Sequence, residues 1–138
     1  MAQKAKETTV SNYSATIAEA SRELSAKERV MYKDLGNAVQ MVDFAKQAIE
    51  NDGKAIIDFA DYVVIDVHND ATEDKDYRNY MLIDKYGNKY YTGSLAFWNA
   101  FMNIYAEMKD SDEEWAVQLN LLPSKNYKGK EILTCSLV

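Results

Sequence analysis

Alternation of apolar and polar positions is clear from the middle of the chain onward and predicts strands. Val63, Ile65 and Val67 lie on one side of a β-branched run at residues 62–68, and this pattern is typical of a strand. The acidic segment that follows, residues 69–76, predicts a loop. The run and the loop are therefore expected to open a β-rich region.

A tight hairpin is predicted immediately afterwards. Residues 77–84 and 89–92 have the composition of strands, and only residues 85–88 separate them. Gly87 lies in this connection and can adopt the positive φ that short hairpin turns need. These two runs are the second and third predicted strands.

A buried helix is predicted over residues 95–109. Ser94 precedes it and is suited to cap the helix, because its hydroxyl oxygen can accept a hydrogen bond from a backbone N–H group. Large apolar side chains then recur at helical spacing. They are Leu95, Trp98, Met102, Tyr105 and Met108, with Phe97, Phe101 and Ile104 widening the stripe.

The last quarter of the chain predicts a second hairpin. Residues 110–114 are an acidic connector, and apolar residues then alternate with polar ones through residues 115–122. A second alternating run covers residues 132–138, and residues 123–130 form the turn between the two. These runs are the fourth and fifth predicted strands.

Five strands with a helix between the third and the fourth predict a mostly β fold with helices, in the α+β class. This order is that of the five-stranded oligonucleotide-binding (OB) barrel, whose first-to-second and fourth-to-fifth strand loops flank the ligand groove. In this chain those loops are residues 69–76 and 123–130. The predicted OB-like barrel covers residues 57–138, and an open α+β sandwich with the same order of elements is the alternative.

The first part of the chain is predicted to be an N-terminal helical extension, residues 14–56. Two helices are expected there, one over residues 15–33 and one that Asn37 caps and Gly53 ends. The alternative is an extra strand at residues 29–32 or 39–44. Residues 1–13 are polar and rich in small side chains, so a disordered tail is expected.

Composition excludes several classes of protein. With 138 residues, of which 47% are hydrophobic, the chain can bury one ordinary core. The only cysteine, Cys135, excludes an internal disulfide and a cysteine-rich zinc site, and its phase with Leu133 and Leu137 places it in the core. No apolar run is long enough for a membrane span, and no leader is visible, so a cytoplasmic protein is expected.

Catalytic chemistry has little support in the sequence. His68 is the only histidine, and the five glycines are isolated, so no phosphate-binding loop is present. The acidic segment at residues 70–76 differs from a calcium loop because Lys75 and Met81 occupy essential positions. We therefore expect a protein without enzymatic activity, cofactor or metal.

The charge of the chain is unevenly distributed. The net charge of -6 arises in residues 57–138, where eight bases accompany fourteen acids, many of them at residues 70–76 and 110–114. An acidic protein is on average repelled by nucleic acid. Because salt screens charges beyond about 10 Å, the local potential at a contact matters more than this average.

The turn at residues 123–130 has the opposite charge. It contains Lys125, Lys128 and Lys130 around Tyr127 and no acid. Lysines can neutralise phosphates and a ring can stack on a base, so this turn is the best candidate contact for single-stranded nucleic acid. The alternative is that its lysines only keep a hairpin tip soluble.

The central hairpin supplies further candidates. Adjacent Tyr90 and Tyr91 must point to opposite faces of a strand, and Lys89 shares the side of Tyr91. A ring and an ammonium on one side could hold a base and its phosphate. The full set of candidate nucleic-acid-binding residues is Lys125, Tyr127, Lys128, Lys130, Lys89, Tyr91, Tyr80 and Arg78.

Two longer stretches carry a resemblance to a known family. They are IDKYGNKYYTGSLAFWNAF (residues 83–101) and LPSKNYKGKEILTC (residues 122–135). Over about residues 60–138, and more loosely over residues 26–40, the chain resembles the single-stranded DNA-binding proteins encoded by bacteriophages and mobile elements of Gram-positive bacteria. The resemblance implies an OB-type barrel. It also implies binding roles for Lys125, Tyr127, Lys128 and Lys130 in the turn at residues 123–130, which we call the lysine-rich turn, and for Lys89 and Tyr91.

Together with this resemblance, the observations predict a protein that coats single-stranded DNA during phage replication or recombination. We expect it to act as a homo-oligomer in the bacterial cytoplasm, with replication or recombination proteins as further partners. Cellular relatives often end in an acidic tail that recruits other enzymes. The sequence ends in a predicted strand instead, so recruitment by such a tail is not expected. The alternative function is an acidic protein-binding module, such as a phage inhibitor that imitates DNA.

Overall fold

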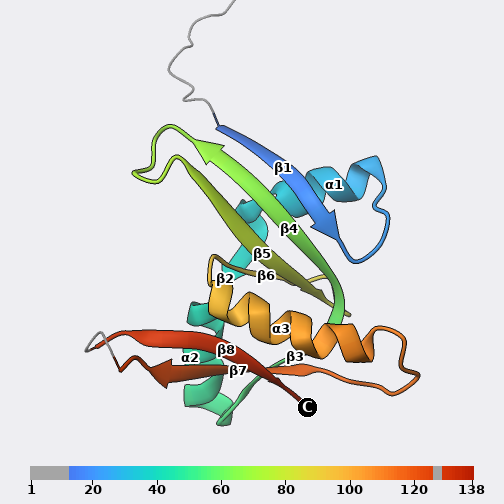
Figure 1. Ribbon diagram of the computed structural model, residues 1–138, viewed down its shortest axis with the longest axis vertical. Helices are drawn as coiled ribbons and strands as arrows, with labels where there is room; N and C mark the ends of the chain where they lie inside the picture. Colours follow the sequence, from blue (N-terminus) through green and yellow to red (C-terminus); the bar gives the residue numbers. More distant parts are fainter. Residues whose placement is uncertain (1–12, 126–128) are drawn as a thin grey trace, which may run out of the picture.

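Two β-sheets and three α-helices make up the described part of the chain, residues 13–125 and 129–138 of a computed structural model. One sheet has five strands in the order β1-β4-β5-β6-β2, and the other has three in the order β3-β7-β8. Figure 1 shows the helix α3 between the two sheets. We refer to them as the large sheet and the small sheet.

The elements follow one another without long connections. In chain order they are β1 (Tyr13–Ala20), α1 (Ala26–Lys33), a 3-10 turn (Leu35–Asn37), β2 (Ala38–Gln40), α2 (Met41–Asp52), β3 (Ala55–Ile57), β4 (Phe59–Asn69), β5 (Asp76–Asp84), β6 (Lys89–Thr92), α3 (Leu95–Met108), β7 (Val117–Pro123) and β8 (Glu131–Leu137).

Strand β4 lies between β1 and β5 in the large sheet and is buried on both faces. Val63, Ile65 and Val67 share one face, as predicted, and belong to a core cluster on the side of α1. Tyr62 and Val64 point to the other face, into the larger core cluster. A strand buried on both sides needs a covering layer on each, and α1 and α3 help to supply them.

The larger core lies between the two sheets. Phe97 and Phe101 of α3 are fully buried there, together with Met41 and Ala45 of α2. The small sheet contributes the side chains of its inner face, namely Val117, Leu119, Leu133 and Cys135. Both helices therefore cover the same face of the small sheet, and its other face carries no helix in the described part of the chain.

Most of the local elements predicted for residues 61–138, the strands, the hairpin turn and the helix, are confirmed. The hairpin β5–β6 turns at Gly87, whose φ is +88°. The hydroxyl of Ser94 accepts a hydrogen bond of 3.1 Å from the backbone N–H of Phe97 and caps α3. Cys135 is buried as expected, whereas Leu95 is 59% exposed because it lies at the first residue of the helix.

The five-stranded barrel is not confirmed. Strands β4, β5 and β6 lie in the large sheet, and β7 and β8 pair in the small sheet, so the described residues form no closed barrel. The order of elements from β4 to β8 agrees with the prediction, but order does not determine which strands pair. Pairing depends on contacts distant in sequence, such as those of β1 with β4 and of β3 with β7.

The prediction of two N-terminal helices is correct only in part. Residues 13–20 form the edge strand β1 rather than the start of a helix, and only Ala26–Lys33 is helical. Residues 38–40 pair with β6 as a short parallel strand, so α2 begins at Met41 and Asn37 does not cap it. Gly53 ends α2 with a φ of +81°, as predicted.

Residues 13–57 therefore contribute strands to both sheets, β1 and β2 to the large sheet and β3 to the small one. The predicted disordered tail lies outside the described residues except for Tyr13, which begins β1.

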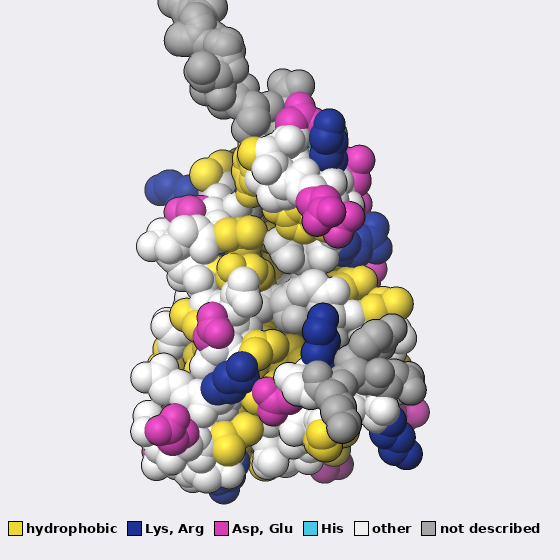
Figure 2. All heavy atoms as spheres, turned by 90° about the vertical axis from the view of Figure 1, so that its left-hand side faces the viewer, with side chains coloured by type: hydrophobic (Ala, Val, Ile, Leu, Met, Phe, Trp, Pro, Cys, Tyr) yellow, Lys and Arg dark blue, Asp and Glu magenta, His cyan; other side chains and the backbone are white. Residues whose placement is uncertain are grey.

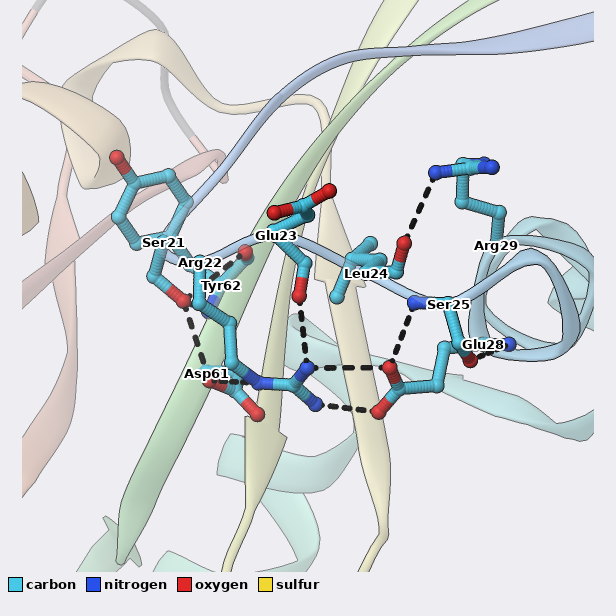
Figure 3. A network of polar contacts seen from close by, with 9 residues as sticks. All are labelled: Ser21, Arg22, Glu23, Leu24, Ser25, Glu28, Arg29, Asp61 and Tyr62. Atoms are coloured by element: carbon cyan, nitrogen blue, oxygen red, sulfur yellow. Dashed lines mark hydrogen bonds and ion pairs between the residues drawn. The ribbon is translucent and has the colours of Figure 1, made fainter.

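A polar network fixes the connection between β1 and α1 to the large sheet (Figure 3). Arg22 donates to the carboxylate of Asp61 at 3.2 Å and pairs with the carboxylate of Glu28. Glu28 also closes a capping box with Ser25, which begins α1. The hydrogen bond from Arg22, followed by that from the Ser25 backbone, lowers the pKa of Glu28 to about 2. The network explains how a helix without a buried side chain is held in place.

Candidate nucleic-acid interface

The lysine-rich turn lies at one end of the small sheet, where β7 leads into β8. Its described ends are joined by a hydrogen bond of 3.0 Å from the Ser124 backbone N–H to the Lys130 carbonyl oxygen. Gly129 has a φ of +79°, which allows the chain to turn into β8. Tyr127 and Lys128 lie outside the described residues.

Lys125 and Lys130 are both exposed at this turn. Within the described part of the chain, neither ammonium group lies within 4.0 Å of a carboxylate. Figure 2 views the side of the molecule that carries the turn, where dark blue basic and magenta acidic side chains are both seen nearby. The turn thus presents cationic groups that can bind an anion.

Two candidates of the central hairpin, Lys89 and Tyr80, make their contacts with other groups of the protein itself. The ammonium group of Lys89 donates to the backbone carbonyl oxygens of Met31 at 2.6 Å and of Asp34 at 2.7 Å. Tyr80 is only 7% exposed, and its ring stacks on Trp98 with centroids 4.8 Å apart and 13° between the planes. The structure therefore shows Lys89 binding the end of α1 and Tyr80 packing in the core.

The other two candidates of this hairpin, Tyr91 and Arg78, lie on different faces of the large sheet. Tyr91 is half-buried and packs in the core cluster on the side of α1, while Tyr90 points to the opposite face, as predicted. Arg78 is exposed and binds both carboxylate oxygens of Asp66, at 2.7 and 3.1 Å. This pairing lowers the pKa of Asp66.

The structure does not bring the two groups of candidates into one groove. Lys89 and Tyr91 lie on the face of the large sheet that packs towards α1. The lysine-rich turn belongs to the small sheet, which faces the other side of the large sheet across α3. A base held by the turn would therefore have to contact other residues.

Such residues are present on the outer face of the small sheet, a surface that the search for lysines and rings missed. Because β7 pairs with β8 in antiparallel register, every second residue points away from α2 and α3. The only signal for this face in the sequence is the alternation of the last quarter. Its members are Ile56, Gln118, Asn120, Leu122, Ile132, Thr134 and Ser136.

A second polar site surrounds His68, at the far end of the large sheet. The two ring nitrogens of His68 lie 2.7 Å from a carboxylate oxygen of Asp76 and 2.9 Å from one of Asp70. The hydrogen bond with Asp76, more than that with Asp70, raises the pKa of His68. An open cavity of about 480 Å³ adjoins this group. Its lining residues are Thr16, Asp66, Val67, His68, Asp76, Tyr77 and Arg78.

Cys135 carries the only thiol of the chain, and it is buried. Burial raises the pKa of the Cys135 thiol to about 12, so the thiolate form is scarce at neutral pH. No cluster of three or more metal-ligating side chains is found in residues 13–125 and 129–138. In the same ranges no helix has both the length and the apolar character needed to cross a bilayer.

The chain matches no family model, and no curated protein or solved structure is significantly similar to it.

Proposed function

We propose that this chain binds single-stranded DNA with little sequence preference and coats DNA strands exposed during phage replication or recombination. The observation that carries the proposal is the lysine-rich turn, where Lys125 and Lys130 are exposed and form no ion pair with any described residue. Cations that no protein acid neutralises are available to replace the counterions of a nucleic-acid backbone.

The proposal includes action in the bacterial cytoplasm as a homo-oligomer, because many copies are needed to cover a strand. It retains the OB-like expectation only as the order of elements from β4 to β8, and it does not depend on closure of a barrel. The stretches that resemble phage single-stranded DNA-binding proteins include the turn and the first half of the helix α3.

The net charge of -6 does not oppose this function at the turn itself. The acidic loop between β4 and β5 lies at the far end of the large sheet, on the other side of α3 (Figure 1). Since screening limits the reach of a charge to about 10 Å in ordinary salt, a phosphate at the turn is affected mainly by the lysines.

The test is the salt dependence of binding to a fluorescent oligothymidine of about 30 nucleotides, a length that exceeds the roughly 4 to 16 nucleotides that one OB fold occupies. If Lys125, Lys128 and Lys130 each neutralise one phosphate, alanine at all three positions should flatten the slope of log K against log salt by about 2. Fluorescence anisotropy at several salt concentrations measures the slope.

A matched control removes the same charge elsewhere. Lys75, Lys85 and Lys109 are exposed and lie on other loops, so their triple alanine variant should retain the wild-type slope. Equal slopes for the turn variant and the wild type would reject the turn as the binding surface.

The acidic site around His68 favours a second candidate function, a module that binds a basic protein partner. Asp66 and Asp76 line one cavity there, Asp70 contacts the ring of His68, and the neighbouring loop adds further acids. Absence of oligothymidine binding at low salt would favour this function over the first.

A further inference from the structure

We infer that the bound strand runs from the lysine-rich turn along the outer face of the small sheet and lays its bases on Leu122 and Ile132. This inference rests on the proposed function and specifies where the DNA lies.

Leu122 and Ile132 form an exposed apolar pair beside the turn. They are paired residues of β7 and β8, so their side chains lie next to each other on one face. Leu122 is 49% exposed and Ile132 is 41% exposed. Two large aliphatic side chains in adjacent positions provide an apolar surface on which the face of a base can pack.

Polar groups continue this surface along the strands. The side-chain amide of Asn120 donates to the hydroxyl of Ser136 at 3.2 Å. The side-chain amide of Gln118 donates to the side-chain oxygen Oδ1 of Asn120 at 3.4 Å. Thr134 lies opposite Asn120 in the same register. Amides and hydroxyls retain further donor and acceptor capacity, so they can contact sugars, phosphates or base edges without requiring one base.

The two faces of the small sheet differ in charge, and this difference favours single-stranded DNA as the molecule that binds the outer face. All seven residues of the outer face are uncharged. Glu131, the acid at the start of β8, is instead directed to the inner side, where its carboxylate lies 3.9 Å from the ammonium group of Lys46 on α2. A face without acids that leads into exposed lysines is complementary to a flexible polyanion.

No aromatic ring belongs to this face. Packing of bases on aliphatic side chains depends on apolar area and distinguishes bases weakly, which agrees with binding that has little sequence preference. The strand tyrosines of the central hairpin, Tyr77, Tyr80, Tyr90 and Tyr91, pack in the two cores and are not needed for the contact.

A pair of threonine variants tests the path of the strand. Thr134→Glu places a negative charge on the outer face, and it should weaken oligothymidine binding by about tenfold at low salt. Thr16→Glu makes the same change on β1 of the large sheet and should leave the affinity within about twofold, since the large sheet lies on the other side of α3 from the small sheet (Figure 1). Circular dichroism would verify that both variants fold.

Thiol footprinting provides a measurement that does not depend on loss of binding. The native Cys135 is buried and reacts poorly, so an introduced cysteine can be modified selectively. Saturating oligothymidine should slow alkylation of Asn120→Cys about fivefold or more, because the reaction needs an accessible thiolate. It should leave Thr16→Cys unchanged.

The outcomes separate the inference from the function. If the wild-type protein binds oligothymidine but Asn120→Cys reacts equally fast with and without it, the DNA lies elsewhere and the inference is wrong, while the proposed function survives. If the wild-type protein does not bind at all, both are overturned.

Discussion

The two hairpins β5–β6 and β7–β8 have turns of similar composition but different partners for their polar groups. Both turns combine lysine, tyrosine, asparagine and glycine, and each has a glycine with positive φ. In the β5–β6 hairpin, Asn88 binds Asp84 and Lys89 binds the end of α1, while Lys85 and Tyr86 remain exposed. In the β7–β8 hairpin both described lysines remain exposed.

Asp84 organises the first of these hairpins. Its carboxylate accepts hydrogen bonds from the backbone N–H groups of Tyr86 and Asn88, from the Asn88 side chain and from the Tyr90 hydroxyl, all between 2.8 and 3.1 Å. The comparison teaches that turn composition alone does not reveal function, and that the partners of each polar group decide it.

The largest expected effect is on Asp84. Asp84→Ala should lower the free energy of unfolding by roughly 3 kcal/mol, because several donors lose a buried charged acceptor. Urea unfolding followed by tryptophan fluorescence measures the change. Asp58 is exposed near the same turn, and Asp58→Ala should change stability by less than about 0.5 kcal/mol. Similar losses for the two variants would contradict the role assigned to Asp84.

The Asp84 effect should depend on pH. Burial alone would raise the pKa of this carboxyl, but the hydrogen bonds from Asn88, Tyr86 and Tyr90 outweigh burial and lower the pKa below its ordinary value of 3.8. A lowered pKa stabilises the fold above the unfolded value and ceases to do so as the pH falls through the folded value. The stability difference between wild type and Asp84→Ala should therefore shrink below about pH 4.

A smaller effect is expected for Lys89, and it sharpens the comparison between the hairpins. Lys89→Met should cost about 1.5 kcal/mol of stability, because the carbonyl oxygens of Met31 and Asp34 lose a charged donor. It should leave the salt slope of oligothymidine binding unchanged. Lys85→Met, at the exposed turn, is the control for stability. A flatter salt slope for Lys89→Met would show that the central hairpin also contacts DNA.

The smallest effect is expected from the two turn glycines. A Cβ added at Gly87 or Gly129 would meet no heavy atom within 4 Å, so alanine at either position introduces only backbone strain. Each substitution should cost about 1 kcal/mol. Only Gly129→Ala should also weaken oligothymidine binding, since it alters the presentation of the lysines. Equal binding by both variants would argue that the conformation of the lysine-rich turn is unimportant.

Strong local patterns explain which parts of the fold could be predicted. The alternation at β4, the turn at Gly87 and the Ser94 cap of α3 are each encoded within a few residues, and all are confirmed. Strand β1 has the sequence YSATIAEA, whose alanines and glutamate favour a helix, and it is a strand because it pairs with β4. Strands β2 and β3 are three residues long, too short for a periodic signal.

The same limit applies to the candidate site. Charge and turn composition predict Lys125 and Lys130 as binding residues; the structure places both at the surface, and their role stays a prediction. Nothing in the sequence indicates that Lys89 binds carbonyl oxygens of residues 31 and 34, because that contact joins segments distant in the chain. The alternation of β8 predicts the buried face correctly at Cys135, but it does not indicate that the opposite face lacks a covering helix.

Residues 13–57 contribute strands to both sheets, and this has a consequence for synthesis on the ribosome. Strand β3 pairs with β7, and α2 packs in part against the small sheet, so neither is fully packed until the β7–β8 hairpin has been translated. Contacts between such distant segments form slowly. We therefore expect the nascent chain to carry unpaired strand edges and uncovered apolar surface until this hairpin emerges, a period in which chaperones would protect it from aggregation.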